Sequence, residues 1–170
     1  MVESQCLKCQ KSVKSLQLGF TLIELMVTIA VMGVIVSLAA PNVSQQLAAQ
    51  RVNNTTSMLA TALKQAKTES AIRRLNVSVI IDDTNKTITV QDQASPINKI
   101  AQYQLKAASS IKINPTTQTT VTFAPNQRVV APVATLVTYT LCDTNTNITP
   151  KQISVDAVAN ITTKTAGSCI

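Results

Sequence analysis

The chain has 170 residues and a formal net charge of +7, with 15 Lys and Arg residues against eight Asp and Glu residues. It contains no His, three Gly residues and four aromatic residues. This composition excludes histidine-based acid–base catalysis, zinc sites with imidazole ligands and glycine-rich phosphate loops, and it requires any hydrophobic core to be aliphatic.

The first predicted element is an apolar segment that runs from Phe20 to Ala40. Its 21 residues contain one formal charge, Glu24, and they are long enough to cross a bilayer as a helix. A carboxylate inside such a segment costs about 2.5–3.5 kcal/mol on insertion scales, so we expect it to be either paired or used. Glu24 is therefore a candidate functional residue.

Charged residues on either side of this segment predict its orientation. Three lysines and one acid, Glu3, precede it, whereas Arg51 is the only basic residue that follows within about twenty positions. We therefore expect a single-pass protein of the inner membrane, with its N-terminus in the cytoplasm. Everything after Pro41 is expected in the periplasm or outside the cell.

Three simpler roles for the apolar segment fit the sequence less well. A secretory signal peptide has a short apolar core and an Ala-x-Ala-like cleavage site, whereas Leu38-Ala39-Ala40 begins with a large residue and is followed by Pro41. A plain membrane anchor would not need Glu24. A lipid anchor needs a cysteine near the cleavage site, and none lies between Cys9 and Cys142.

The start of the segment resembles the N-terminus of the type IV pilin and pseudopilin family. In that family a leader ends in Gly, is cut before Phe, and leaves Thr-Leu-Ile-Glu-Leu behind, which matches this sequence from Gly19 to Leu25. The resemblance implies that prepilin peptidase removes residues 1–19 and methylates the α-amine of Phe20. It also implies that Glu24 pairs with the amine of a neighbouring subunit's Phe20.

The helix is predicted to continue beyond the membrane as a periplasmic half over residues 42–75, after a transmembrane half over 20–41. Pro41, which with Asn42 matches the family's helix-bending position, should kink it. Arg73 and Arg74 should lie near its end, where cations complement the helix dipole. Small and aliphatic residues recur at intervals of three and four, which predicts a buried stripe: Ala48, Val52, Thr55, Leu59, Ala62, Leu63, Ala66 and Ser70.

After Asn76 the apolar pattern changes to the period of two that is typical of strands. Residues 77–81 and 87–90, joined by a polar turn at 82–86, predict a β-hairpin. Further strands are expected at 100–105, 120–123, 135–141, 152–155 and 161–164. We therefore predict an α+β fold in which a long N-terminal transmembrane helix continues into a strand-rich periplasmic head over residues 76–170.

The four cysteines fall into two pairs. Cys6 and Cys9 lie in the predicted leader and lack further ligands for a metal site, so we regard them as incidental. Cys142 and Cys169 remain in the mature chain, and in an oxidising compartment they are expected to form a disulfide. Loop-closure entropy assigns such a bridge roughly 3.5 kcal/mol.

Catalysis is not expected. The carboxylates of Asp92, Asp143 and Asp156 show no spacing that would pair them for acid–base work, and Asp82 with Asp83 fits a solvated turn. We therefore predict no catalytic residue, no cofactor and no metal.

The head resembles the FimT/FimU/GspH branch of minor pilins and pseudopilins, through Phe123-Ala124-Pro125-Asn126-Gln127, Leu141-Cys142-Asp143 and the alternating stretch from Gln152 to Val155. Gln127 departs from the branch, which usually has Gly there. The resemblance implies a subunit near the tip of a filament that helps to start or prime its assembly. We expect a minor type IV pilin, and a GspH-like minor pseudopilin of a type II secretion system is the alternative.

A second alternative is a competence pilin that binds extracellular DNA. From Val43 onward the chain has 12 Lys and Arg residues against six Asp and Glu residues, a net charge of +6. Arg128, Lys151 and Lys164 lie where DNA-binding members of the branch carry their contacts, but the Gly-Arg-x-Arg motif of those members is absent. Scattered cations neutralise few phosphates, so we expect weak binding at most.

Overall fold

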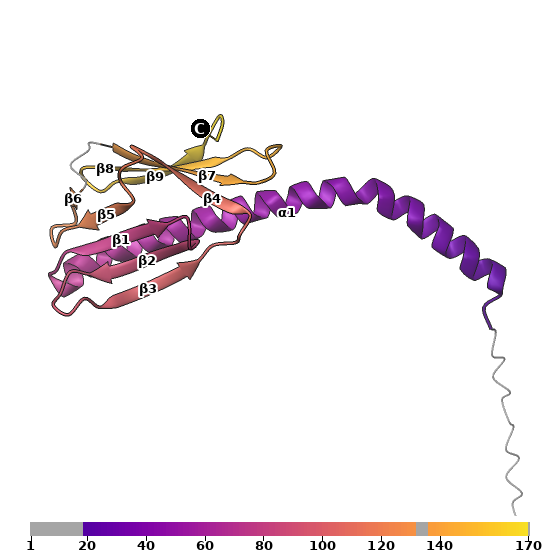
Figure 1. Cartoon of the computed structure of the whole chain (residues 1–170), viewed down its shortest axis with the longest axis horizontal. Helices are drawn as coiled ribbons and strands as arrows, with labels where there is room; N and C mark the ends of the chain where they lie inside the picture. Colours follow the sequence, from indigo (N-terminus) through magenta and orange to yellow (C-terminus); the bar gives the residue numbers. More distant parts are fainter. Residues whose placement is uncertain (1–18, 132–135, 170) are drawn as a thin grey trace, which may run out of the picture. The chain divides into compact units, whose positions relative to one another are not determined.

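The computed structural model describes residues 19–131 and 136–169, and at residues 39–42 and 131 it describes the backbone alone. A long helix, α1 (Leu22–Arg73), is followed by a series of strands (Figure 1). The strands are β1 (Val77–Asp82), β2 (Thr87–Asp92), β3 (Lys99–Gln104), β4 (Ser109–Asn114), β5 (Thr120–Phe123), β6 (Val129–Ala131), β7 (Leu136–Asp143), β8 (Lys151–Asp156) and β9 (Ile161–Thr165).

The chain divides into two compact units, Met1–Ala40 and Pro41–Ile170. Judged by length and hydropathy, the described residues contain no single helix that qualifies as a membrane span, whereas Leu22–Leu38 and Val43–Arg73 qualify together as a bent pair. The predicted leader lies almost wholly outside the described residues, and the kink expected at Pro41 stays a prediction.

The second unit contains two antiparallel sheets. One has the strand order β3-β2-β1-β5-β6 and the other has the order β4-β7-β8-β9. The C-terminal half of α1 lies beside these strands in Figure 1. The α+β fold with a long helix and a strand-rich head is thus confirmed, and the predicted 77–90 hairpin corresponds to β1 and β2, which pair from Val77↔Asp92 to Asp82↔Thr87.

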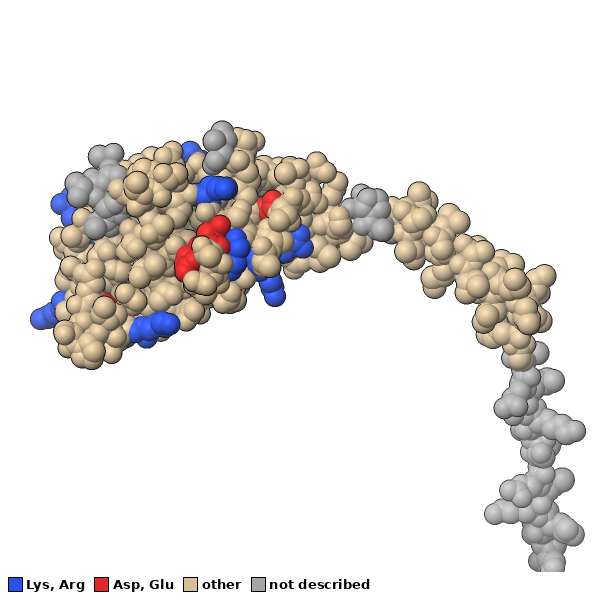
Figure 2. All heavy atoms as spheres, in the orientation of Figure 1, with Lys and Arg blue, Asp and Glu red and all other residues tan. Residues whose placement is uncertain are grey.

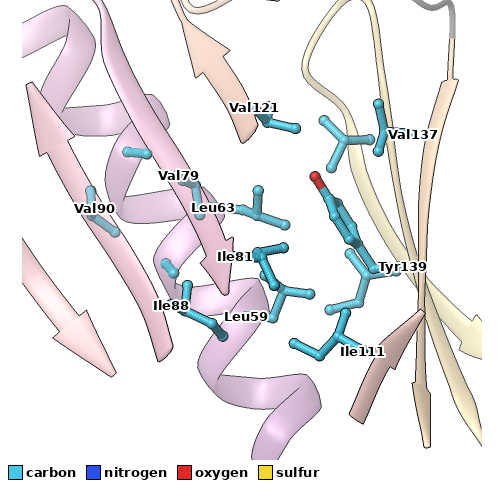
Figure 3. Packing of buried hydrophobic residues seen from close by; sticks show 14 of the residues in the cluster. Leu59, Leu63, Val79, Ile81, Ile88, Val90, Ile111, Val121, Val137 and Tyr139 are labelled. Atoms are coloured by element: carbon cyan, nitrogen blue, oxygen red, sulfur yellow. The ribbon is translucent and has the colours of Figure 1, made fainter. Parts of the chain in front are cut away.

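The core forms where the helix meets the two sheets. All eight residues of the predicted stripe are no more than 3% exposed. Figure 3 shows Leu59 and Leu63 of α1 beside Val79 and Ile81 of β1, with Tyr139 of β7 on the other side of the cluster. The core is aliphatic apart from Phe123 and Tyr139, and burial raises the pKa of the Tyr139 phenol.

The two polar members of the stripe are satisfied by the head. The Thr55 hydroxyl donates to Ser109 Oγ of β4 at 3.2 Å, and the Ser70 hydroxyl donates to the carbonyl oxygen of Ala124 at 2.9 Å. A buried hydroxyl without such a partner would destabilise the fold. These contacts fix the position of the helix against the sheets.

Two strands were missed, the end of the helix differs from the prediction, and most of the predicted strands differ by one or two residues at an end. β4 and β6 were not predicted, because Ser109-Ser110 has weak strand propensity and β6 spans three residues. The helix ends at Arg73, two residues earlier than predicted, because Arg74 adopts a left-handed conformation with φ of 55°. Residue 135, the predicted start of one strand, lies outside the described residues.

Candidate functional site

The N-terminal half of α1 exposes apolar side chains on all sides. From Phe20 to Leu38 its large hydrophobic residues are between 54% and 78% exposed. The stretch contains no Lys or Arg and one acid, Glu24, and the side of it that faces the viewer in Figure 2 shows uncharged residues. A helix that is apolar all round has to be covered, either by lipid or by other helices.

The first turn of α1 explains why the helix begins at Leu22. The Glu24 backbone N–H donates to the Thr21 hydroxyl oxygen at 3.2 Å, which makes Thr21 the N-cap. Thr21-Leu22-Ile23-Glu24 is also the sequence of a capping box, and a carboxylate in the first turn interacts favourably with the helix dipole. This local role of Glu24 was not predicted from the sequence.

Beyond that role, the Glu24 carboxylate has no ion pair with any described residue. The Gly19–Phe20 bond lies just before the helix, in a non-helical segment from Gly19 to Thr21. Both residues of this bond are exposed, and beyond Gly19 and its two chain neighbours no described atom lies within 4 Å of the position that a Cβ on Gly19 would take. The predicted cleavage site is therefore open to an enzyme.

A disulfide joins Cys142 and Cys169, as predicted, with a Cα–Cα distance of 6.0 Å. Cys142 is buried near the end of β7, and Cys169 follows β9 in the C-terminal segment. The bridge therefore fastens the C-terminal segment to an interior strand of the second sheet.

Next to this disulfide lies an ion pair that was not predicted from the sequence. Arg51 Nε and Nη2 donate to the two carboxylate oxygens of Asp143 at 2.7 and 2.9 Å. The Asp143 side chain is fully buried, and the hydrogen bonds from Arg51 hold the pKa of this carboxyl below its usual range. The pair links the helix to the end of β7 across 92 positions of sequence, so no local pattern could have revealed it.

The other carboxylates of the head also have structural partners. Asp92 accepts backbone N–H bonds from Asn98 and Ala94, which lowers its pKa, and the pair with Arg73 adds to this effect. Asp156 accepts N–H bonds from Val158 and Asn160 in the β8–β9 turn. Within the described residues no group of three or more His, Cys, Asp or Glu side chains could hold a metal ion.

Comparisons with known proteins agree with the N-terminal segment and the fold described above. Residues 14–40 match the prokaryotic N-terminal methylation motif. The fold is similar to two crystal structures of the type IV minor pilin FimU of Pseudomonas aeruginosa, with TM-scores of 0.54 and 0.55 at 19% identity, covering 74% and 78% of this chain and 99% of FimU. The minor pseudopilin EpsH of the Vibrio cholerae type 2 secretion system gives 0.56 at 12% identity, covering 69% of this chain and 99% of EpsH. No curated protein matches the sequence.

The chain has a pilin-like fold. Its N-terminal motif and its fold agree with the resemblance to minor pilins and pseudopilins that its sequence indicates.

Gln127, which stands where the FimT/FimU/GspH branch usually has Gly, lies in the loop between β5 and β6. Gln127 has φ of 60°, the left-handed region that glycine occupies most easily, and its N–H donates to the Ala124 carbonyl at 2.8 Å. The Gly that is usual in the branch would fit this backbone without a Cβ penalty. Gln127 therefore keeps the turn but carries local strain.

The three cations proposed for DNA do not form one patch. Lys151 and Lys164 lie on adjacent strands, but Gln152 is the register partner of Lys164, so the two lysines project from opposite faces of the sheet. Arg128 directly precedes β6, whose Val129 N–H donates to the carbonyl oxygen of Ala157. Ala157 follows the last residue of β8, whereas Lys151 is the first residue of β8, so Arg128 lies at the other end of that strand. On the face in Figure 2 the basic side chains are scattered, and some of them lie beside acidic ones.

Proposed function

We propose that this pilin-like protein is a minor subunit of a type IV pilus, which packs into the filament through the N-terminal half of α1 and acts by packing, not by catalysis. The exposed apolar surface from Phe20 to Leu38 carries this proposal, because in a filament it would be covered by helices of other subunits. The methylation motif over the same residues supports it.

Before assembly, the helix would anchor the protein in the inner membrane, with the N-terminus in the cytoplasm and the head in the periplasm. The lysines before the apolar segment support this orientation, and the Cys142–Cys169 disulfide suits an oxidising compartment. Prepilin peptidase would then cut between Gly19 and Phe20 and methylate the new amine. Intact-mass measurement of the membrane-extracted protein tests this, and a mature chain that begins at Met1 or Pro41 would contradict it.

Glu24 is proposed as the assembly contact. Its carboxylate has no ion-pair partner among the described residues, and cleavage would create a positively charged amine at Phe20. Inside a bundle of apolar helices, a carboxylate and an amine from neighbouring subunits would each remove the cost of leaving the other unpaired. This pairing would set the axial position of one subunit against the next.

Replacement of Glu24 separates assembly from membrane insertion. A Glu24→Leu chain should insert as well as the wild type, or better, yet be depleted from the sheared filament fraction. Thr28→Leu is the matched control, because it also replaces a polar side chain of the same helical segment by an apolar one. Among the described residues, the Thr28 hydroxyl bonds only to the Leu25 carbonyl of its own helix. Normal incorporation of Glu24→Leu would show that the carboxylate is not an assembly contact.

We place the subunit near the filament tip, where it would help to start or prime assembly, by analogy with the minor pilin fold. A GspH-like minor pseudopilin is the second candidate, and the match to EpsH favours it about as much as the match to FimU favours a pilus. Co-purification of the full chain with sheared pili, or with the components of a secretion pseudopilus, separates the two. The DNA-uptake alternative gains no support from the dispersed positions of Arg128, Lys151 and Lys164.

A further inference from the structure

The outer face of the β4-β7-β8-β9 sheet carries a row of polar residues that the proposed subunit role does not use. Lys112 of β4 pairs with Thr140 of β7, Thr140 with Gln152 of β8, and Gln152 with Lys164 of β9. Directly paired residues project from the same face of a sheet, so these four side chains form one continuous row. The opposite face is the buried one, with Ile111, Tyr139 and Ile153 in the core.

This row borders a hollow of about 590 Å³ on the same face. Thr138, Gln152, Asn114 and Ser168 are among the residues that line it, together with Thr140, which is 8% exposed. Lys164 is the one charged residue among the described residues that line the hollow, and Lys112 lies outside the lining, at the β4 end of the row. Within the described part of the chain, none of these side chains has a hydrogen bond to another protein group, whereas the neighbouring Ser154 and Thr162 hydroxyls bond to each other at 2.7 Å. The hollow therefore presents donors and acceptors that are available to a ligand.

The chemistry of the lining defines the kind of ligand. Hydroxyl and amide side chains both donate and accept hydrogen bonds, which matches the hydroxyl groups of a sugar. Lysine contributes an ammonium group that suits an acidic substituent, and no carboxylate of a described residue lines the hollow to repel one. The ligand should thus be rich in hydroxyl groups and carry negative charge.

The distance between Lys112 and Lys164 indicates how far apart the negative charges of the ligand should be. Lys112 and Lys164 are three strand spacings apart, about 14 Å, and the residues between them are uncharged. Duplex DNA carries one negative charge per roughly 1.7 Å of its axis, and two distant cations would neutralise few of its phosphates. A chain with widely spaced acidic groups and hydroxyls between them fits the row better.

We propose that this face is a binding site for an acidic polysaccharide. Lys112 and Lys164 bind two carboxylates of the polymer, and Thr138 and Gln152 bond to the sugar hydroxyls between them. The binding does not require incorporation into a filament, so its failure would leave the proposed subunit role untouched.

Fluorescence polarisation of the full chain in detergent tests this proposal with three labelled probes at physiological salt. They are a hyaluronan hexasaccharide, which has one carboxylate on every second sugar, the neutral maltohexaose, and a short duplex DNA. The hyaluronan probe should bind at least about tenfold more tightly than maltohexaose, since the neutral sugar offers no charge-assisted hydrogen bond to lysine. It should also bind more tightly than the duplex, because two distant cations neutralise few of the duplex phosphates.

Single substitutions locate the site. Lys112→Gln and Lys164→Gln should each weaken hyaluronan binding about tenfold, and Gln152→Glu, which puts a carboxylate between the lysines, should abolish it. Lys151→Gln is the matched control, because it removes the same charge one position away on the opposite face. No hyaluronan binding, an equal loss in all three lysine variants, or tighter binding of the duplex through the same lysines would each overturn the proposal.

Discussion

The two halves of α1 meet different surroundings. From Phe20 to Leu38 every large apolar side chain is exposed, whereas from Ala48 to Ser70 the same helix buries a stripe of small and aliphatic residues against its own sheets. The second half has its partners within the chain, through Leu59 and Leu63 and through the Arg51–Asp143 pair. The first half exposes all of its large apolar side chains, and in the proposed role lipid or the helices of other subunits cover them.

The largest effect should come from a cavity in the buried half. Leu63→Ala removes a side chain with no exposure, and we expect it to lower the free energy of unfolding of the head by about 3–5 kcal/mol. Ile35→Ala, in the exposed half, should leave that free energy unchanged. Urea unfolding of the full chain in detergent, followed by tyrosine fluorescence, tests both variants, because both tyrosines lie in the head. Equal effects of the two substitutions would contradict the contrast between the halves.

Removal of the disulfide should act on the head alone. The bridge closes a loop with a sequence separation of 27, and its loss should cost roughly 3.5 kcal/mol by loop-closure entropy. The Cys142→Ser, Cys169→Ser double variant should therefore unfold at lower urea concentration, while it partitions into membranes like the wild type. Two free thiols in the oxidised native protein, detected by alkylation, would show that the bridge does not form.

These contrasts also show what the sequence could predict. The stripe from Ala48 to Ser70 and the β1–β2 hairpin follow from periodicity, because each pattern reports which face of an element is buried. The disulfide was predicted from the oxidising compartment expected for the head and from the two cysteines that remain after the leader. The Arg51–Asp143 pair could not be predicted, because it depends on how the helix packs against the end of β7. The row from Lys112 to Lys164 could not be predicted either, because strand register brings together residues that are distant in sequence.

A smaller, pH-dependent effect should come from Asp143. Its pKa in the folded protein lies below its usual value because Arg51 donates two hydrogen bonds to it. The pair therefore contributes stability above about pH 4, and this contribution is lost as the pH falls through the folded-state pKa. Asp143→Asn should be less stable than the wild type at pH 7, and the difference should narrow toward pH 3.

Arg51→Met provides the matched test of the same pair. Like Asp143→Asn, it should make the free energy of unfolding depend less on pH between pH 7 and pH 3 than it does in the wild type, since it removes the other partner of the pair. If the Asp143→Asn deficit stayed constant from pH 7 to pH 3, the lowered pKa would not be the source of the stability.

The smallest effect, and the most local, concerns the β5–β6 loop of the head. Gln127 holds φ of 60°, which costs an L-residue roughly 1–2 kcal/mol, while Gly loses more conformational entropy on folding by about 0.5–1 kcal/mol. Gln127→Gly should therefore stabilise the head by a few tenths of a kcal/mol to about 1 kcal/mol. Asn126→Gly is the matched control and should destabilise, because it adds flexibility and removes the bond from the Arg128 N–H to Asn126 Oδ1 at 3.1 Å. Changes of the same sign at the two adjacent positions would show that backbone strain at Gln127 does not limit the stability of this turn.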